Sequence, residues 1–294
     1  MKFVKMHGLG NDYVYLDAVS NPQIEMYSDL PALARAMSDR HRGVGGDGII
    51  LLCRPTVPDA EVRMRMFNAD GSEAEMCGNG VRCVAKFAHD RLGVRRRPLR
   101  VQTGRGVLEI ACELDGAGRV RAATVDMGRP ILDLAGIPVD AGRLSAAAND
   151  GEFHLRHSGA DGLAWTFVSM GNPHAVCFVA DPEAVARMGG LADPSTIERH
   201  PAFPNRVNVH VAAVVSPGRA IMRTWERGAG YTLACGTGAC AVLVAGVVTG
   251  RLPRRAVLTL PGGELDVRWD EPQGSVLMTG PAEELFEGEW PDRR

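Results

Sequence analysis

The chain has 294 residues, of which 45% are hydrophobic and 23% are charged, and its formal net charge at pH 7 is -2. Such a chain can bury the core of one large domain or two modest ones. The near-neutral charge without blocks of like sign argues against a nucleic-acid partner, and no apolar stretch is long enough to span a bilayer. We therefore expect a protein that acts on a small molecule, without a membrane or nucleic acid.

Apart from the segment that follows Cys77, the first half of the chain contains one helix signal and two clear strand signals. A helix is expected from Asp29, a capping residue followed by a first-turn proline, to just before Gly43. Apolar and polar residues alternate over 61–67 and 106–114, as in half-buried strands.

The segment 43–48 reads GVGGDG and fits the glycine pattern of nucleotide-binding loops. That site requires a strand before the glycines and a helix after them. Here the expected helix precedes the glycines, and the apolar run 49–52 follows them. The order is reversed, so the pattern does not predict a nucleotide cofactor.

The second half predicts strands over 207–215, 220–226 and 264–269 by the same alternation, and the last strand, 276–279, is expected to lead the tail back. Two further helices are expected after Cys77 and Cys235, each ending at a glycine, Gly93 and Gly250. The sum is a strand-rich α+β chain.

The chain repeats itself at long range. Residues 65–80 read RMFNADGSEAEMCGNG and residues 223–238 read RTWERGAGYTLACGTG, and Gly-Asn pairs at 10–11 and 171–172 precede the two cysteines by similar intervals. A duplicated domain explains this pattern better than chance. We expect one half at 1–125, joined by the tail 278–294, and the other at 126–277.

Each half places a cysteine immediately before a Gly-x-Gly turn that opens a helix. The free amides and partial positive charge of a helix N-terminus stabilise a thiolate and bind a carboxylate, and glycines let that carboxylate approach the backbone. Two such cysteines on opposite faces of a Cα–H could invert the carbon, because one removes the proton and the other returns one. Amides aimed at the carboxylate would stabilise the enolate-like charge.

Cofactors and metals are not expected. Pyridoxal chemistry needs a Schiff-base lysine, and the only lysines are Lys2, Lys5 and Lys86, none in a recognisable setting for it. The seven cysteines are odd in number and scattered, which favours free thiols and a cytoplasmic location over a disulfide framework. None has histidines at zinc-finger spacing.

Two other interpretations of the cysteines stay open. A cysteine is most often a small buried hydrophobe, and we apply that interpretation to the five outside the repeat, Cys53, Cys83, Cys112, Cys177 and Cys240. A cysteine hydrolase with His174 as its base would also use one thiol, but it leaves the second motif unexplained.

The chain resembles diaminopimelate epimerases over nearly its whole length, through KMHGLGND, FNADGSE, CGNG, VSMGNPH, RVN, ERGAG, ACGTGAC and LPGG. The resemblance implies two pseudo-symmetric β-barrel-like domains, each around a central helix, with the active site in the cleft between them. It implies interconversion of LL- and meso-2,6-diaminoheptanedioate by a homodimer without a cofactor, in the lysine and peptidoglycan pathways.

By position, the resemblance implies Cys77 and Cys235 as the two acid/base residues. Backbone amides of Gly78, Asn79, Gly236 and Thr237 would hold the reacting carboxylate, while His174 and Glu226 would adjust the thiol pKa values. Arg227, whose fork of donors suits a distal carboxylate, would bind the rest of the substrate together with Asn11, Asn68, Asn172, Asn208 and Glu226.

Three positions depart from that family pattern. Gly48 stands where many relatives have a substrate-binding glutamine, Tyr231 where a glutamate is common, and Phe286 where some relatives have a tyrosine at the dimer contact. The nearest alternative is a proline-racemase-like or other two-cysteine amino-acid racemase. A non-catalytic relative would be expected to lack one cysteine, and both are present.

Overall fold

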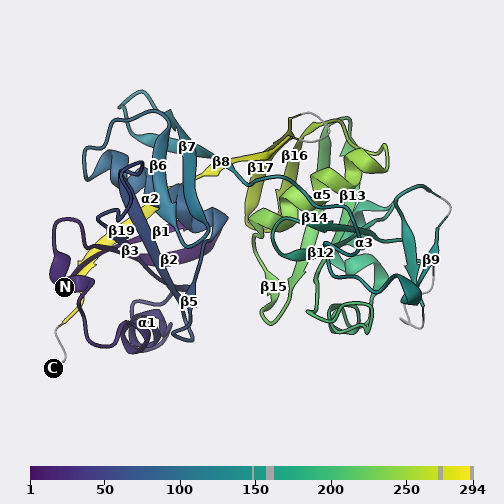
Figure 1. Cartoon of the computed structure of the whole chain (residues 1–294), viewed down its shortest axis with the longest axis horizontal. Coiled ribbons are helices and arrows are strands. Elements are labelled where there is room, and N and C mark those ends of the chain that lie inside the picture. The colour runs from purple at the N-terminus through teal and green to yellow at the C-terminus, as the bar shows by residue number, and fades with distance from the viewer. Residues whose placement is uncertain (148, 157–161, 271–273, 292–294) are drawn as a thin grey trace. The chain divides into compact units, whose positions relative to one another are not determined.

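The structure, a computed structural model, describes residues 1–147, 149–156, 162–270 and 274–291. The chain divides into two compact units, the first made of Met1–Asp126 with Thr279–Arg294 and the second of Met127–Met278 (Figure 1). That the halves 1–125 with 278–294 and 126–277 are duplicated domains stays a prediction, and residues 292–294 lie outside the described residues.

The first unit is built mainly from strands joined in a fixed order of pairing. β1 pairs antiparallel with β2, β2 parallel with β3, β3 antiparallel with β4, and β4 both antiparallel with β5 and parallel with β6. β6, β7 and β8 follow as an antiparallel meander. The bounds are β1 Lys2–Gly8, β2 Asn11–Asp17, β3 Gly48–Cys53, β4 Val62–Asn68, β5 Glu73–Ala74, β6 Leu99–Thr103, β7 Gly106–Leu114 and β8 Val120–Asp126.

The first α-helix, α1 (Leu30–Ser38), begins where the sequence predicts and ends earlier. Asp29 caps it, its carboxylate accepting from the amide of Ala32 at 2.8 Å. The helix was expected to reach almost to Gly43. It stops because Asp39 leaves the helical conformation and its carboxylate instead accepts from the amides of His41 and Arg42, a local turn that competes with helix.

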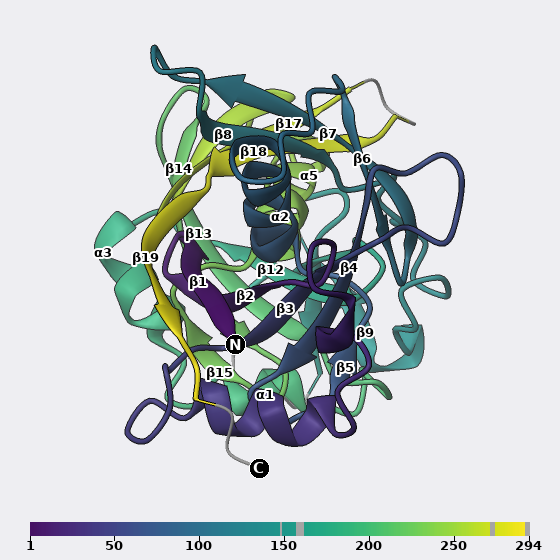
Figure 2. The same cartoon turned by 90° about the vertical axis from the view of Figure 1, so that its left-hand side faces the viewer.

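The central helix of the first unit is α2 (Gly78–Asp90). It contacts β1, β2, β3, β4, β6, β7 and β8, and Figure 2 shows it lying among these strands. Its apolar side chains are buried, and so is Arg82, which donates to the carbonyl oxygens of Gly78 and Pro281 and to the side-chain oxygen of Asn79. The first turn of α2 is thereby tied to its surroundings.

The second unit repeats the pairing order of the first. β11 pairs antiparallel with β12, β12 parallel with β13, β13 antiparallel with β14, and β14 antiparallel with β15 and parallel with β16, which is antiparallel to β17. β9 and β10 form a separate hairpin. The bounds are β9 Leu144–Ala146, β10 Phe153–Leu155, β11 Thr166–Ser169, β12 Pro173–Phe178, β13 Asn208–Ser216, β14 Arg219–Glu226, β15 Gly230–Thr232, β16 Arg255–Leu260 and β17 Gly263–Trp269.

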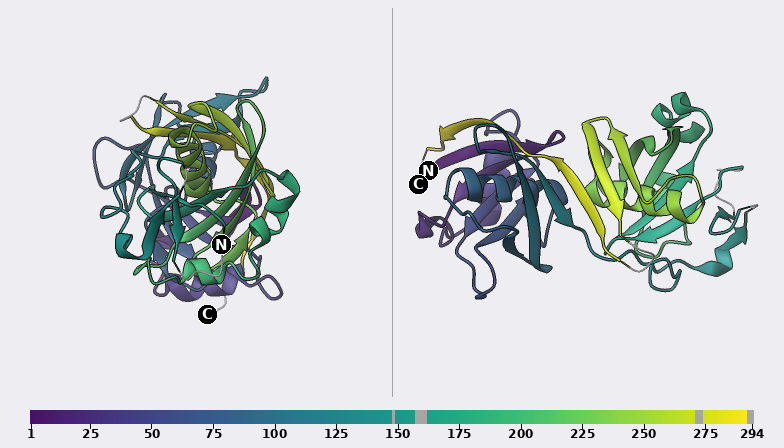
Figure 3. Two further views of the ribbon diagram at one scale, coloured as in Figure 1. Left: turned by 90° about the vertical axis from the view of Figure 1, so that its right-hand side faces the viewer. Right: turned by 90° about the horizontal axis from the view of Figure 1, so that it is seen from above.

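The helix α5 (Gly236–Val248) occupies the centre of the second unit, as the left view of Figure 3 shows. It contacts β11, β12, β13, β16 and β17. Its sequence is apolar on every side, as expected of an enclosed helix. The predicted strand-rich α+β fold, with a central helix in each unit, is confirmed.

Two short helices of the second unit were not predicted. α3 (Pro182–Ala186) and α4 (Ser195–Glu198) lie in the connection from β12 to β13, where the first unit has α1 between β2 and β3. Val185 and Ile197 from these helices pack into a core cluster with Trp165. Among the described residues, no helix is both long and apolar enough to cross a membrane.

The tail returns to the first unit. β18 (Val276–Pro281) carries the chain back, and the hydroxyls of Thr124 and Thr279 lie 2.7 Å apart. β19 (Glu283–Glu289) then pairs antiparallel with β1, and the amide of Trp290 donates to the carbonyl of Met1. Met1 and Trp290 therefore lie side by side.

Candidate active site

The first half-site lies at the N-terminus of α2, where Cys77 is the capping residue. Its backbone is extended, and its sulfur accepts from the amide of Gly80 at 3.4 Å. The same sulfur lies 3.3 Å from Oδ1 of Asn11, the first residue of β2. Because a carbonyl oxygen can only accept, the thiol of Cys77 donates in this contact.

Asn11 is held in place by a network of charges. Its Nδ2 donates to Oδ2 of Asp47 at 2.6 Å, and Oδ1 of Asp47 accepts from Arg40 at 2.9 Å. Oδ1 of Asn11 also accepts from the side-chain nitrogen Nδ2 of Asn79 at 3.4 Å. Asp47 therefore fixes which end of the Asn11 amide faces the sulfur.

Asp12 joins the same network. Burial opposes its charged form, but hydrogen bonds from Arg40 and Lys5 outweigh that effect, and the pKa of Asp12 is lowered. Lys5, only 4% exposed, lies 2.6 Å from the Asp12 carboxylate. The half-site of the first unit is thus supported by paired ions.

Asn68 and Gly48 lie opposite each other at the ends of β4 and β3. The side-chain amide of Asn68 donates to Ser72 at 2.9 Å. A Cβ built on Gly48 would lie 2.1 Å from the carbonyl oxygen of Phe67. This backbone therefore leaves no room for a glutamine at position 48.

The second half-site lies at the N-terminus of α5, where Cys235 is the capping residue and is 5% exposed. Its sulfur is 3.7 Å from the hydroxyl of Thr237. Burial, and then the carboxylate of Glu226, raise the pKa of Cys235 well above its usual value, while Thr237 and the amide of Gly238 act in the opposite direction.

Asn172 and His174 stand behind Thr237. Nδ2 of Asn172 donates to the Thr237 hydroxyl at 3.4 Å, and Nε2 of His174 lies 3.0 Å from Oδ1 of Asn172. Nδ1 of His174 lies 2.8 Å from Nε2 of His210. Both ring nitrogens of His174 therefore have partners other than sulfur, whereas a hydrolase base would be bonded to its thiol.

Sequence reasoning missed His210. It is wholly buried, and its Nδ1 lies 2.9 Å from the hydroxyl of Thr224 on β14. Burial lowers the pKa of His210 to about 3, and burial together with His210 and Arg227 lowers that of His174 well below its usual value, so both rings are neutral. The available signal was spacing: His210 lies two residues after Asn208 and therefore on the same face of β13.

The remaining candidates line the edge of the second unit where β12 and β13 begin and β14 ends. Asn208 donates from its amide to the carbonyl of Pro173 at 2.9 Å and accepts from the backbone amide of Arg227 at 3.1 Å. The exposed guanidinium of Arg227 donates to the carbonyl of Asn205, and Glu226 accepts from the hydroxyl of Thr232 at 2.6 Å.

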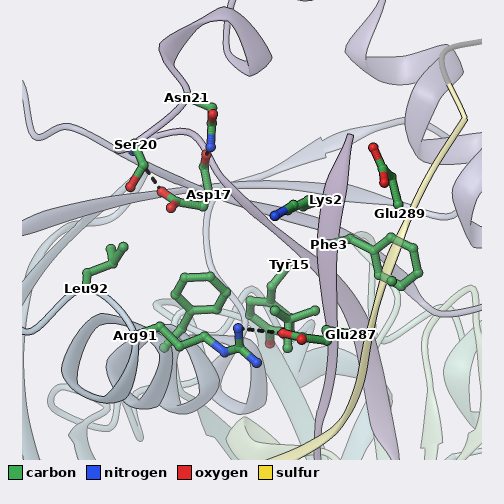
Figure 4. A pocket seen from close by; sticks show the side chains of 13 residues that line it. Lys2, Phe3, Tyr15, Asp17, Ser20, Asn21, Arg91, Leu92, Glu287 and Glu289 are labelled. Atoms are coloured by element: carbon green, nitrogen blue, oxygen red, sulfur yellow. Dashed lines mark hydrogen bonds and ion pairs between the residues drawn. The ribbon is translucent and has the colours of Figure 1, made fainter.

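A hollow elsewhere in the first unit contains none of the candidate residues. It has a volume of about 590 Å³ and is lined by β1, β2, the end of α2 and β19; Figure 4 shows Arg91 and Glu287, whose side chains are 2.9 Å apart, on its wall.

All seven cysteines of the chain are free thiols. Within the described residues, no three His, Cys, Asp or Glu side chains gather as a metal site would require.

The two-unit fold is that of a class of proteins that includes PhzF-family proteins and epimerases. It is shared with a phenazine biosynthesis protein of the PhzF family from Bacillus anthracis, at a TM-score of 0.65 and 16% identity over 99% of both chains. It is also shared with a predicted epimerase from Pseudomonas aeruginosa, at a TM-score of 0.65 and 22% identity over 98% of both chains.

Sequence similarity narrows this class to one family. The family model described as diaminopimelate epimerase matches residues 3–132 and 166–285. The diaminopimelate epimerase of Pelotomaculum thermopropionicum is 48% identical over the full length of both chains. The chain belongs to the diaminopimelate epimerase family, and it is an isomerase, as the resemblance in its motifs predicted.

Proposed function

We propose that this chain interconverts LL- and meso-2,6-diaminoheptanedioate, with Cys77 and Cys235 as its two proton carriers. The observation that carries the mechanism is positional: each cysteine caps the central helix of its unit, at the same place in the same pairing order of strands. Membership of the diaminopimelate epimerase family supports the substrate.

The proton balance of this mechanism needs no cofactor. A thiolate on one face takes the α-proton and becomes a thiol, and the electron pair passes into the substrate carboxylate. The thiol on the other face then gives its proton to the carbon and becomes the thiolate. Each turnover leaves the enzyme with the thiol and thiolate exchanged, ready for the reverse reaction.

The charge that develops on the carboxylate would be stabilised by backbone amides at the two helix ends, those of Gly78, Asn79, Gly236 and Thr237. Helix N-termini are suited to this task because their first amides have no partner within the helix. The rest of the substrate carries two ammonium groups and a second carboxylate. We assign these to Asn11, Asn68, Asn172, Asn208, Glu226 and Arg227.

Epimerisation of LL-diaminopimelate in deuterated water tests this function. In the first turnovers the meso product should carry one deuterium, at the inverted α-carbon, because the proton that arrives comes from a solvent-exchanged thiol. Return of the original proton to the inverted carbon would contradict the two-carrier mechanism. Faster inversion of proline than of diaminopimelate would favour the racemase alternative.

We further propose a homodimer that works in the cytoplasm without pyridoxal phosphate. Phe286 of β19 packs edge-on against Phe3 yet remains 49% exposed, next to the exposed Leu285, which supports a contact surface on this strand. The free thiols support a reducing compartment. In sedimentation, the wild type should behave as a dimer and Phe286→Glu as a weakened dimer. Dialysis of the wild type against a pyridoxal scavenger should leave its activity intact.

A further inference from the structure

The repeat gives every residue of the second half-site a counterpart in the first. Tyr13 in β2 corresponds to His174 in β12, because each stands two residues after the asparagine of its Gly-Asn pair. Ile50 pairs with Met66 across β3 and β4, and His210 pairs with Thr224 across β13 and β14. Where the first unit has Ile50 and Met66, the second has His210 and Thr224.

These positions lie directly beneath the first turn of each central helix. A Cβ on Gly80 would lie 2.7 Å from the side chain of Ile50, and one on Gly238 would lie 2.4 Å from the ring of His210. An apolar side chain fills this place in the first unit. The second unit buries polar groups there, which is costly unless every group is bonded.

The polar groups form one continuous series of hydrogen bonds, buried from Thr224 to His174 and half-buried at Asn172 and Thr237. From Thr224 it passes to His210 at 2.9 Å, to His174 at 2.8 Å and to Asn172 at 3.0 Å. It continues to the hydroxyl of Thr237 at 3.4 Å and ends at the sulfur of Cys235 at 3.7 Å.

The donors and acceptors in this chain all point one way. Oδ1 of Asn172 can only accept, so Nε2 of the neutral His174 donates and its Nδ1 accepts. Nε2 of His210 must then donate and its Nδ1 must accept, which makes the hydroxyl of Thr224 the first donor. Since Asn172 donates to the hydroxyl oxygen of Thr237, that hydroxyl has its proton available for the sulfur.

We propose that Thr224, His210, His174 and Asn172, of which the first three are buried, form a one-directional hydrogen-bond chain that holds the Thr237 hydroxyl as a donor to Cys235. His210 and Thr224 are positioning residues, because they act on the sulfur through other side chains. Hydrogen bonds in series polarise one another, so a remote member contributes at the sulfur. The proposal rests on the proposed role of Cys235 as a proton carrier.

The charged groups around Cys235 explain why a hydrogen-bond chain would matter for its thiolate. The Glu226 carboxylate of β14 disfavours the thiolate, whereas the Thr237 hydroxyl favours it. His174 of β12 and His210 of β13 are neutral, and Arg227 follows β14 at the exposed edge. The chain therefore stabilises the thiolate without placing a second ion in the core.

Replacing Thr224 tests the chain at its far end. Thr224→Val removes the first donor and keeps the shape, whereas Thr224→Ser keeps the donor. Thr166→Val is the matched control, because Thr166 is a buried threonine of the same unit whose hydroxyl has no hydrogen-bond partner among the described residues. The readout is the rate of iodoacetamide alkylation of Cys235 against pH, followed by mass spectrometry of its peptide, with the Cys77 peptide as an internal reference.

Thr224→Val should raise the alkylation midpoint of Cys235 by about half a pH unit, which slows its alkylation below the midpoint about threefold. Thr224→Ser and Thr166→Val should leave the Cys235 midpoint unchanged, and the Cys77 midpoint should not move in any variant. An unchanged Cys235 midpoint in Thr224→Val, or an equal shift in Thr224→Ser, would overturn the proposal.

The same samples separate this proposal from the proposed function. If the Cys235 midpoint shifts but the protein does not epimerise diaminopimelate, the proposed hydrogen-bond chain is supported and the proposed function is wrong. If the protein epimerises diaminopimelate normally and the midpoint does not shift, the function is supported and the hydrogen-bond chain is wrong. Thermal unfolding of Thr224→Val beside Thr166→Val shows whether the two variants are equally folded, and His210→Phe, which fills the same space, should shift the midpoint at least as far as Thr224→Val.

Discussion

The half-sites around Cys77 and Cys235 share a helix, a capping position and a strand order, yet differ in what stands behind the sulfur. Behind Cys77, Asn11 is oriented by the ions of Asp47 and Arg40. Behind Cys235, the supporting groups are neutral histidines and threonines. The two units place their thiols at the same position in the same strand order, while the side chains around the thiols differ.

The difference gives the two sulfurs unlike neighbours, although the Cys77 sulfur also accepts from the amide of Gly80. Cys77 faces a carbonyl oxygen, to which only a thiol can donate, while Cys235 faces a hydroxyl that can donate to a thiolate. If the two cysteines carry the proton as we propose, one must begin a turnover as a thiol and the other as a thiolate, and unlike surroundings would favour such a pair.

Removing either thiol is the strongest test of the pair. Cys77→Ala and Cys235→Ala should each lower the rate of inversion by more than about 1,000-fold, because each face of the carbon needs its own proton carrier. The measurement is conversion of LL- to meso-diaminopimelate by chiral chromatography. Substantial turnover in Cys235→Ala would mean that one residue serves both faces.

The two units also differ in the residues proposed to bind the distal end of the substrate. By the repeat, Glu226 and Arg227 of the second unit correspond to Asn68 and Ala69 of the first, so only the second offers ions there. Arg227→Lys should lower kcat/KM about 100-fold, because a point charge does not reproduce a two-pronged carboxylate contact. A comparable loss with a monocarboxylate analogue would show that Arg227 does not bind the distal carboxylate.

Acid should destabilise the second unit before the first. The pKa of His210 is lowered to about 3, so the unfolded chain takes up a proton below pH 6.5 that the folded state refuses, and stability falls as the pH drops. Between pH 7 and pH 5 the loss from His210 should be about 2 kcal/mol. The lowered pKa of Asp12 costs stability only below about pH 4.

Urea unfolding at the two pH values checks this expectation. Trp165, Trp225 and Trp269 lie in the second unit and Trp290 in the first, so tryptophan fluorescence reports mainly on the second. His210→Phe should reduce the dependence on pH. An unaltered dependence would mean that His210 is already charged in the folded protein.

Asp47→Asn should have the smallest effect. The variant loses the charged acceptor that orients Asn11, so the Asn11 amide can turn over, and we expect a rate loss of about tenfold and a loss of about 1 kcal/mol in stability. Asp115→Asn, in a turn of the same unit whose carboxylate accepts from the amides of Ala117 and Arg119, is the control. Equal rate losses in the two variants would remove the orienting role of Asp47.

The sequence predicted the elements that repeat a local pattern and the motifs that carry chemistry. Alternation placed the strand 106–114 at the residues it occupies, and the Asp29 cap placed the start of α1. The repeated Cys-Gly-x-Gly turn singled out Cys77 and Cys235, and the family resemblance implied the same two residues. These features depend on neighbours along the chain, which a single sequence displays.

What it did not predict depends on contacts between distant segments. His210 lies in a strand of alternating apolar and polar residues, and that pattern predicts a half-exposed position for a polar side chain. Its pairing with Thr224 and its contact with α5, which the sequence does not display, place it in the core. The glycines of the two motifs are expected to admit a carboxylate, which stays a prediction. The structure adds a second role that the sequence did not show, because Gly80 and Gly238 make room for Ile50 and His210.

The close approach of Gly238 to His210 has an evolutionary consequence. With the His210 ring 2.4 Å from where a Cβ would stand, position 238 cannot acquire even a methyl group until position 210 has first become smaller. Substitutions at these two sites must therefore arise in a fixed order along any lineage. Descendants of such a chain should show alanine at 238 only together with a small residue at 210, a covariation between positions 28 residues apart that no local pattern would suggest.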